Sequence, residues 1–268
     1  MIQLIAIDLD GTLLKNDKTI SKENKKVLRL AKEKGVKIVI TTGRPLKAIH
    51  HILEELNLLD EGDYSITFNG GLVQKNATGE ILDKITMSLS SIQEIYQALF
   101  SLHLPCDVVS DGEVYQLPSD RISLYEAATP FLNFHKVKPE ELQETTIYNK
   151  IICATEPDYL DEKAAQLPSV IREKYEVIKS RDILLEFMPK GVTKAYGIAH
   201  LAEILGISQS EIMAIGDEEN DLSMIEYAGV GVAMANAVPM IQSAADVITR
   251  SNEDDGVAHI ISQYLEVE

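Results

Sequence analysis

Near the start of the chain, short apolar runs alternate with segments whose apolar residues recur every three or four positions. The runs at residues 4–7, 36–41 and 64–68 are typical of buried strands, and the first is apolar on both faces, as in a central parallel strand. Residues 21–35 and 45–56 instead place their apolar side chains along one helical stripe. Strand, helix, strand, helix and strand in this order predict a doubly wound α/β sheet.

The alternation breaks near residue 72 and returns near residue 191. Between these points, Gly79 and Asp111-Gly112 are hairpin-turn signals, and residues 91–94 form a capping box that predicts a helix start. We therefore expect a Rossmann-like, doubly wound and mainly parallel sheet core from residues 1–83 and 188–268, interrupted by an inserted α+β domain at 84–187. The later elements of the core are expected at 193–206, 212–215, 221–228, 230–233, 247–248 and from 256.

The charge balance narrows the class of partner. The 268 residues include 25 Lys and Arg against 42 Asp and Glu, a formal net charge of −17. Such an acidic chain argues against nucleic acid or an anionic membrane as a partner. Two cysteines, Cys106 and Cys153, are too few for a disulfide framework, and residues 1–12 resemble neither a signal peptide nor a membrane span. We expect a cytoplasmic protein, and a monomer because no heptad or exposed apolar stripe is present.

Polar residues that could carry chemistry follow the predicted strands at four places. They are Asp8 to Thr12, Thr41 to Arg44, Lys194, and the stretch from Gly216 to Asp221. Open α/β sheets bind ligands at the carboxyl ends of their strands. Each place alone is also typical of a turn, a loop, a solvated lysine or a helix cap. Four in this order favour a functional site.

The motifs at these places resemble a known family. DLDGTLL, TTGRP, FNGG, the Lys of KGVTK, GDEENDLSMI and DDGVA resemble, in order, the haloacid dehalogenase superfamily of phosphohydrolases and its Cof-type sugar-phosphatase branch. The resemblance covers the whole chain and makes the inserted domain a cap over the substrate. One departure is Ala235, where the branch usually has Gly, which concerns loop geometry and no catalytic role.

The resemblance implies a role for each matching residue. Asp8 would be the nucleophile that becomes an aspartyl phosphate, and Asp10 would protonate the leaving oxygen and then take a proton from water. Mg²⁺ would be held by Asp8, the Asp10 backbone carbonyl and Asp217, with Asp221 in support. The phosphoryl oxygens would be bound by the Leu9 amide, Thr42, Gly43, Lys194 and Asn220.

Elementary electrostatics agree with these roles. A carboxylate about 4 Å from a phosphate dianion meets roughly 8 kcal/mol of repulsion at an effective dielectric near 20. A divalent cation and Lys194 would together balance Asp8 and the phosphate, and oxygen ligands suit Mg²⁺. Asp10 can act as an acid only if its pKa lies well above about 3.9, and we expect burial and neighbouring carboxylates to raise it.

The leading hypothesis is a Mg²⁺-dependent phosphatase of small phosphorylated metabolites, with sugar phosphates expected. A phosphosugar mutase would share Asp8 and Asp10 and return the phosphoryl group to a sugar. A phosphorylated receiver domain and an inactive ligand sensor are the non-enzyme alternatives. Asp10 argues against the receiver, because it would hasten hydrolysis of the acyl phosphate, and the sensor reading requires a missing catalytic group. Asn69-Gly70 follows a core strand and either faces the same cleft or only shapes a turn.

Overall fold

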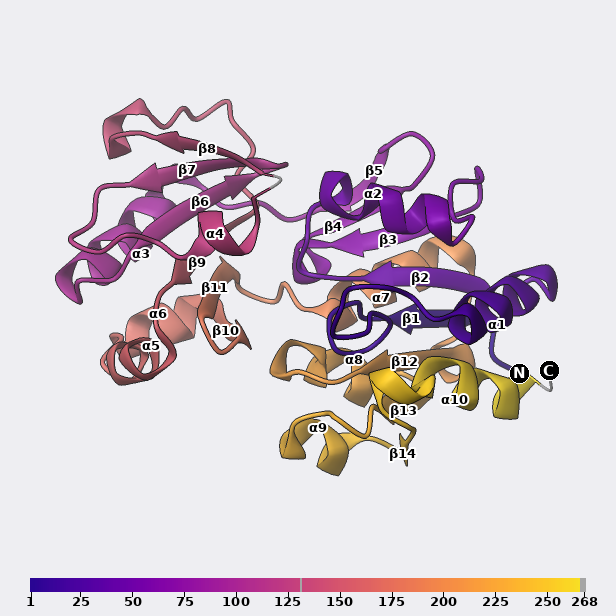
Figure 1. Ribbon diagram of the computed structural model, residues 1–268. Coiled ribbons are helices and arrows are strands. Elements are labelled where there is room, and N and C mark those ends of the chain that lie inside the picture. The colour runs from indigo at the N-terminus through magenta and orange to yellow at the C-terminus, as the bar shows by residue number, and fades with distance from the viewer. Residues whose placement is uncertain (131, 266–268) are drawn as a thin grey trace. The chain divides into compact units, whose positions relative to one another are not determined.

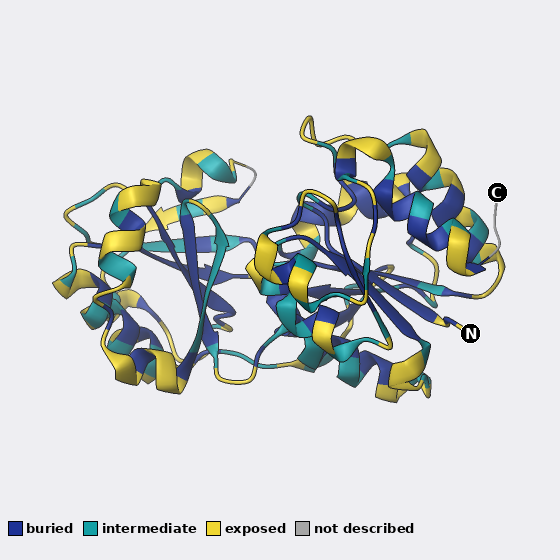
Figure 2. Ribbon diagram, turned by 90° about the horizontal axis from the view of Figure 1, so that it is seen from below, coloured by how far each residue is buried: buried dark blue, intermediate teal, exposed yellow. Residues whose placement is uncertain are grey.

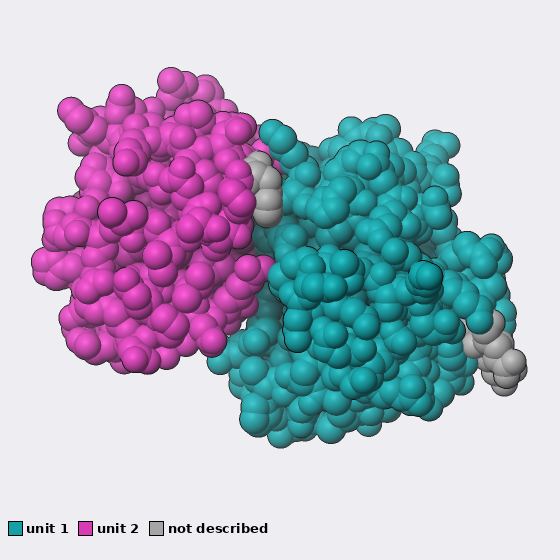
Figure 3. Space-filling view, viewed as in Figure 1, with its two compact units in different colours: residues 1–84, 193–268 teal, residues 85–192 magenta. Residues whose placement is uncertain are grey.

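The computed structural model describes residues 1–130 and 132–265 and divides into two compact units (Figure 3). The core unit comprises Met1–Lys84 and Thr193–Glu268, and the inserted unit comprises Ile85–Val192. The sequence placed the second boundary after residue 187. The structure keeps residues 188–192 with the inserted unit, because strand β11 (Leu184–Pro189) continues in that unit's sheet.

The core unit is built on an eight-stranded sheet in the order β14-β13-β12-β1-β2-β3-β4-β5 (Figure 1). The strands from β14 to β3 are parallel, and β4 and β5 extend the sheet in antiparallel fashion. The strand β1 is buried at every position, as expected for a strand with neighbours on both sides. Their bounds are Leu4–Ile7 (β1), Lys37–Thr41 (β2), Tyr64–Thr67 (β3), Leu72–Lys75 (β4), Ile81–Lys84 (β5), Ile212–Gly216 (β12), Val230–Ala233 (β13) and Val247–Ile248 (β14).

Helices cover both faces of this sheet (Figure 2). Helix α1 packs against α10, and α8 packs against both α7 and α9. Local chemistry sets their ends: the Ser21 side chain accepts a hydrogen bond from the Asn24 amide at the start of α1, and Gly206 ends α7 in the left-handed conformation. The helices are α1 (Lys22–Glu33), α2 (Leu46–Glu55), α7 (Lys194–Leu205), α8 (Leu222–Tyr227), α9 (Pro239–Ala244) and α10 (Gly256–Leu265), with 3₁₀ turns η1 (Phe68–Gly70), η3 (Gln209–Glu211), η4 (Glu219–Asp221) and η5 (Asn252–Asp254).

The inserted unit has its own six-stranded sheet, in the order β10-β11-β9-β6-β7-β8. All its pairs are antiparallel except β7 with β8. Alternate residues such as Val108 and Ile151 join an apolar cluster with the unit's helices, whereas Asp107, Lys150 and Glu186 occupy the intervening positions. The elements are β6 (Cys106–Ser110), β7 (Glu113–Leu117), β8 (Asn133–Lys136), β9 (Lys150–Ala154), β10 (Tyr175–Arg181), β11, α3 (Leu89–Ser101), α4 (Tyr125–Ala128), α5 (Pro157–Ala164), α6 (Ser169–Lys174) and η2 (Pro139–Glu141).

One predicted helix start is wrong. The capping box at residues 91–94 does not open a helix, because α3 already begins at Leu89. Ser88 is the N-cap, and its hydroxyl accepts a hydrogen bond from the Ser91 amide at 3.1 Å. A run of serines offers several equivalent caps, so the sequence alone does not choose between them. No helix in the described part of the chain is both long and apolar enough to span a bilayer.

Candidate active site

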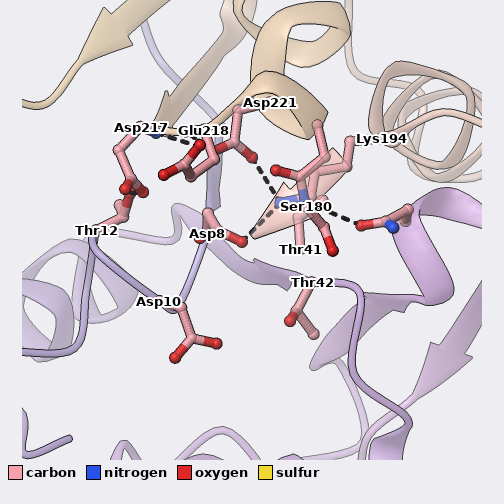
Figure 4. A network of polar contacts seen from close by, with 12 residues as sticks. Asp8, Asp10, Thr12, Thr41, Thr42, Ser180, Lys194, Asp217, Glu218 and Asp221 are labelled. Carbon is pink, nitrogen blue, oxygen red and sulfur yellow. Dashed lines mark hydrogen bonds and ion pairs between the residues drawn. The ribbon is translucent and has the colours of Figure 1, made fainter. Parts of the chain in front are cut away.

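Three core strands end in polar residues at the same edge of the sheet. Asp8 follows β1, Thr42 follows β2, and Asp217 follows β12, and these strands are neighbours with β1 in the middle. Parallel strands bring their carboxyl ends together, so residues far apart in sequence share one site. The four places singled out in the sequence all contribute side chains here (Figure 4).

Lys194 lies at the centre of this group. It is the first residue of α7, where the Thr193 hydroxyl accepts a hydrogen bond from the Tyr196 amide at 3.2 Å and caps the helix. The Lys194 side chain is completely buried, and its Nζ lies 2.6 Å from Asp8 Oδ1 and 2.5 Å from Asp221 Oδ1 (Figure 4). A buried ammonium held by two carboxylates is a fixed positive charge beside Asp8.

Three carboxylates form a group that can hold a metal ion. Asp8, Asp217 and Asp221 are buried, and each offers one oxygen within 4.8 Å of the others. Asp221 also orders the loop, because its Oδ2 accepts the backbone amides of Asp217 at 2.9 Å and Glu218 at 3.0 Å. Thr12 donates its hydroxyl to Asp217 Oδ1 at 2.6 Å. These contacts orient the carboxylates before any ligand arrives.

Gly11 is required by the same packing. Its φ of +81° lies in the left-handed region, and a Cβ there would be 2.1 Å from Asp217 Oδ2. A side chain at position 11 would therefore clash with the Asp217 carboxylate, and glycine avoids this clash.

Burial shifts the ionisation of this group strongly. Burial raises the pKa of Asp8 to about 7, with Lys194 opposing the shift and Asp221 adding to it. Burial and the two neighbouring carboxylates raise the pKa of Asp217 to about 9. Burial alone would lower the pKa of Lys194, but Asp221 and Asp8 raise it overall. When all three carboxylates are ionised, they and the one ammonium carry two negative charges in a buried site, which matches one divalent cation.

Asp10 lies outside the three-carboxylate group and faces two cations. Arg44 Nη2 donates to both Asp10 oxygens at 2.7 Å and Arg44 Nε to Oδ2 at 3.0 Å, while Lys18 Nζ lies 2.9 Å from Oδ1. The Asp10 side chain is 21% exposed. The sequence did not reveal these two cations, which fold against Asp10 from positions 18 and 44.

The remaining predicted residues lie around the end of β2. The Thr42 hydroxyl accepts the Arg44 amide at 3.2 Å, and Thr42 O accepts the Asn69 amide at 3.0 Å. Asn220 donates its side-chain amide to Asn69 Oδ1 at 3.1 Å, and a Cβ on Gly43 would lie 3.0 Å from that same oxygen. Asn69 thus joins Asn220 to the loop after β2.

Leu9 is buried between Asp8 and Asp10 and turns the loop after β1. Its carbonyl accepts the Leu14 amide at 2.8 Å, which folds the chain back after the two aspartates. This turn separates the directions of the neighbouring carboxylates, so that Asp8 faces Lys194 and Asp10 faces Arg44.

Sequence reasoning did not assign the supporting roles of Arg44, Lys18 and Thr12, and it left Asn69 open between a place in the site and a turn. Arg44, Lys18 and Thr12 each bind an aspartate of the site, and Asn69 binds Asn220. Arg44 and Thr12 stand inside the TTGRP and DLDGT motifs, so their positions were a signal. Lys18 carried none, because it is one lysine among several in a polar loop.

Comparison with known proteins identifies the family. A family model for haloacid dehalogenase-like hydrolases matches residues 5–261. The chain belongs to this family. The Bacillus subtilis (strain 168) protein YxeH, whose name calls it a phosphatase, is 38% identical to this hydrolase over 99% of both chains. The 5-amino-6-(5-phospho-D-ribitylamino)uracil phosphatase YcsE of the same organism is 30% identical, over 98% of the hydrolase and 96% of YcsE.

Solved structures show the same fold. A haloacid dehalogenase-like hydrolase from Bacteroides thetaiotaomicron matches with a TM-score of 0.83 and 29% identity, over 98% of this chain and 100% of that one. The subclass IIB sugar phosphatase BT4131 matches with a TM-score of 0.82 and 25% identity, over 99% of this chain and 100% of that one. The doubly wound fold and the phosphohydrolase family predicted from the sequence are confirmed, and phosphatase activity is supported for the hydrolase.

Proposed function

We propose that the hydrolase is a Mg²⁺-dependent phosphatase that acts in the cytoplasm on small phosphorylated metabolites, with sugar phosphates as its substrates. The observation that carries the proposal is the buried Lys194 ammonium between Asp8 and Asp221, with Asp217 completing the acidic group. Asp8 and Asp217, with the Asp10 carbonyl, would hold Mg²⁺, and Asp221 would support them. The bound cation would neutralise charge on the phosphoryl group and on Asp8.

In the first step, Asp8 attacks phosphorus. The new bond joins an Asp8 carboxylate oxygen to phosphorus, and the bond between phosphorus and the substrate oxygen breaks. Asp10 gives its proton to the departing oxygen, so it must carry one when this step begins. Lys194, Thr42, Asn220 and the amides of Leu9 and Gly43 bind the phosphoryl oxygens and stabilise their charge during transfer.

In the second step, water attacks phosphorus on the aspartyl phosphate. Asp10, now ionised, takes the proton from water, and the bond between phosphorus and the Asp8 oxygen breaks. Inorganic phosphate leaves and both aspartates return to their starting states. Arg44 and Lys18 bind the Asp10 carboxylate and hold it in place for this proton transfer.

The names of two relatives support the substrate class. The relative YcsE is named for a substrate with a phosphate on a ribityl chain, and the structural relative BT4131 is described as a sugar phosphatase. Both substrates are phosphate monoesters of a polyhydroxylated carbon chain. We infer that this hydrolase takes a phosphate monoester of the same kind.

The test compares phosphate release by wild type, Asp8→Asn and Asp17→Asn, with Mg²⁺ and with EDTA. The substrates are p-nitrophenyl phosphate and a panel of hexose and pentose phosphates. Asp17 is an exposed aspartate of the same N-terminal segment, so its variant controls for the loss of a carboxylate. We expect wild type and Asp17→Asn to turn over only with Mg²⁺, and Asp8→Asn to lose at least about 10³-fold in kcat.

Two outcomes would contradict the proposal. Full activity in EDTA would show that the reaction needs no metal ion. Full activity of Asp8→Asn would show that Asp8 is not the nucleophile. A requirement for a sugar bisphosphate activator, with phosphate retained on sugar, would instead identify a phosphosugar mutase.

A further inference from the structure

The loop after β1 contains a lysine in a backbone conformation that lysine rarely adopts. Lys18 has a φ of +67°, in the left-handed region. Among the residues that the structure describes, seven other than glycine have a positive φ, and five of these are Asn, Asp or His, which adopt it most readily. Lys18 and Phe68 are the two exceptions, and Phe68 directly precedes Asn69 of the candidate site. Such an outlier requires an explanation.

The hydrogen bonds of this loop are typical of a turn that prefers glycine at position 18. The Lys18 amide donates to Lys15 O at 2.9 Å, and the Lys15 amide donates to Thr19 O at 2.9 Å. This is the pattern of a three-residue hairpin loop, in which the last loop residue is left-handed. Glycine adopts that conformation without strain, whereas the Cβ of any L-residue crowds the backbone. The lysine at this position therefore carries a conformational cost that glycine would avoid.

Contacts with the rest of the core unit keep the loop in this strained form. The Asn16 amide donates to Glu253 Oε1 at 2.7 Å, and Asn252 Nδ2 donates to Leu14 O at 3.0 Å. Both partners belong to the turn η5, which lies far away in the sequence. A strained residue persists only where its surroundings fix it, and these contacts do so on the loop that carries Lys18.

Stability does not explain a lysine at this position. Lys18 Nζ lies 2.9 Å from Asp10 Oδ1, and the lysine side chain is 58% exposed. An exposed ion pair contributes little to stability, because water already solvates both charges and the long side chain loses freedom. The contact is therefore a weak reason to keep a strained residue in the fold. Its effect on the carboxylate of Asp10 is the remaining reason.

The direction of the Asp10 side chain matters for the proposed first step. In-line transfer places the leaving oxygen on the side of phosphorus opposite Asp8, so the acid has to point away from that residue. The buried Lys194 ammonium beside Asp8 attracts carboxylates to the wrong side. Arg44 and Lys18 oppose this attraction, and Figure 4 shows Asp10 apart from the carboxylates around Lys194.

We propose that Lys18 is a positioning residue, which directs Asp10 toward the leaving oxygen and thereby decides which phosphate esters the hydrolase cleaves well. The inference rests on the proposed function, because it takes Asp10 as the acid. An acidic phenol leaves phosphorus without a proton, whereas the oxygen of an alcohol needs one. Lys18 thus favours esters of weakly acidic alcohols, and a glycine in the same turn would not.

The experiment compares kcat/KM for p-nitrophenyl phosphate, phenyl phosphate and glucose 6-phosphate with Mg²⁺. This ratio reports the steps up to departure of the leaving group, so hydrolysis of the aspartyl phosphate does not mask them. In Lys18→Met and Lys18→Gly, we expect a loss of less than about twofold for p-nitrophenyl phosphate, a larger loss for phenyl phosphate and about tenfold for glucose 6-phosphate.

Two matched variants control for charge. Lys18→Arg keeps a cation at the same position, and its kcat/KM values for the three esters should stay in the wild-type proportion. Lys15→Met removes a lysine from the same loop and should leave all three values unchanged.

Urea unfolding separates this role from a structural one. Lys18→Gly relieves the left-handed backbone, so we expect a midpoint no lower than that of wild type although glucose 6-phosphate turnover falls. Lys18→Met keeps the strain, so its midpoint should not exceed that of Lys18→Gly. A lysine that only stabilised the loop would lose stability and act on the three esters equally.

The outcomes distinguish this inference from the proposed function. Equal losses for the three esters, or no loss for any, would overturn the role of Lys18 while Mg²⁺-dependent phosphatase activity remains. A wild-type chain that releases no phosphate with Mg²⁺, or an Asp8→Asn variant with full activity, would overturn the proposed function and this inference with it.

Discussion

At the scale of single residues, Asp8 and Asp10 are separated only by Leu9, yet their side chains lie in different surroundings. Asp8 is buried against Lys194, and Asp10 is partly exposed against Arg44 and Lys18. The motif predicted which aspartates and which lysine would meet at the strand ends. It could not reveal the surroundings of Asp10, because Arg44 lies 34 residues away and its direction depends on the fold.

Asp10→Asn should separate the two proposed chemical steps. p-Nitrophenolate leaves without help from an acid, so the variant should still form the aspartyl phosphate. It lacks the base for water, so the second step should slow by about 10²–10⁴-fold. Rapid-quench kinetics should show a burst of about one equivalent of p-nitrophenol and a phosphorylated chain, neither of which Asp17→Asn should give. Steady turnover at the wild-type rate would contradict the role of Asp10.

The raised pKa values of Asp8, about 7, and Asp217, about 9, predict how pH acts on the metal-free protein. Both values exceed the ordinary carboxyl value, so the folded chain binds more protons than the unfolded chain between about pH 4 and pH 9. The free energy of unfolding should therefore fall as pH rises through this window. Because Mg²⁺ needs the ionised carboxylates, its apparent affinity should rise over the same window.

Denaturant unfolding in EDTA at several pH values between about 5.5 and 9 checks this prediction. Asp217→Asn should make the decline shallower, because its group no longer titrates. Burial also raises the pKa of Asp107 to about 6, which contributes a decline of the same sign, so the difference between the two proteins isolates Asp217. A metal-free stability that rises with pH in this window would contradict the assignment.

At the scale of elements, the position of α7 decides where Lys194 lies. Its limits were predictable, because Thr193 and Gly206 are good capping residues. Its contact with the turn η1 was not predictable, since it depends on a close approach across 123 residues of sequence. A Cβ on Gly70 would lie 1.9 Å from Thr193 O, directly before Lys194.

Gly70→Ala should therefore displace the start of α7 and reduce both stability and activity. Gly70 also has a φ of +102°, which strains any other residue. Gly35→Ala is a matched control, because Gly35 has a φ of +88° but nothing within 4 Å of the added carbon. We expect about 1 kcal/mol of destabilisation at Gly35 and several kcal/mol at Gly70, with lost phosphatase activity only at Gly70. Equal effects in urea unfolding and in kcat would contradict the packing argument.

Some strands could not be predicted from the sequence for a different reason. The strand β10 carries charged and half-buried residues and lies in the sheet of the inserted unit because β11 pairs with it. The antiparallel β4 and β5 extend a sheet whose other neighbours are parallel. Such strands depend on their partners more than on their own pattern.

At the scale of the whole molecule, each unit has its own apolar cluster. Ile5 belongs to the cluster of the core unit and Ile151 to that of the inserted unit. The alternation of strands and helices predicted the type of sheet. The sheet order, with β12 beside β1, could not be deduced, because it joins strands separated by the whole insertion.

Calorimetric unfolding should therefore show two transitions, and Mg²⁺ should raise only the one from the core unit. Ile5→Ala should lower the midpoint of the Mg²⁺-sensitive transition, and Ile151→Ala should lower that of the other transition. Each substitution should reduce the free energy of unfolding of its unit by about 2–5 kcal/mol, because both side chains are fully buried. A single transition that both substitutions and Mg²⁺ move together would show that the units unfold as one.

The place of β1 in its sheet has a consequence for the growing chain on the ribosome. Its partner β2 emerges early, but its other partner, β12, begins only at Ile212. All of residues 85–192 are made in between, and they form a unit with its own apolar cluster. This unit can fold while one edge of β1 is still unpaired and open to aggregation. The half-made core therefore keeps an unpaired strand edge until residues 212–216 have been made.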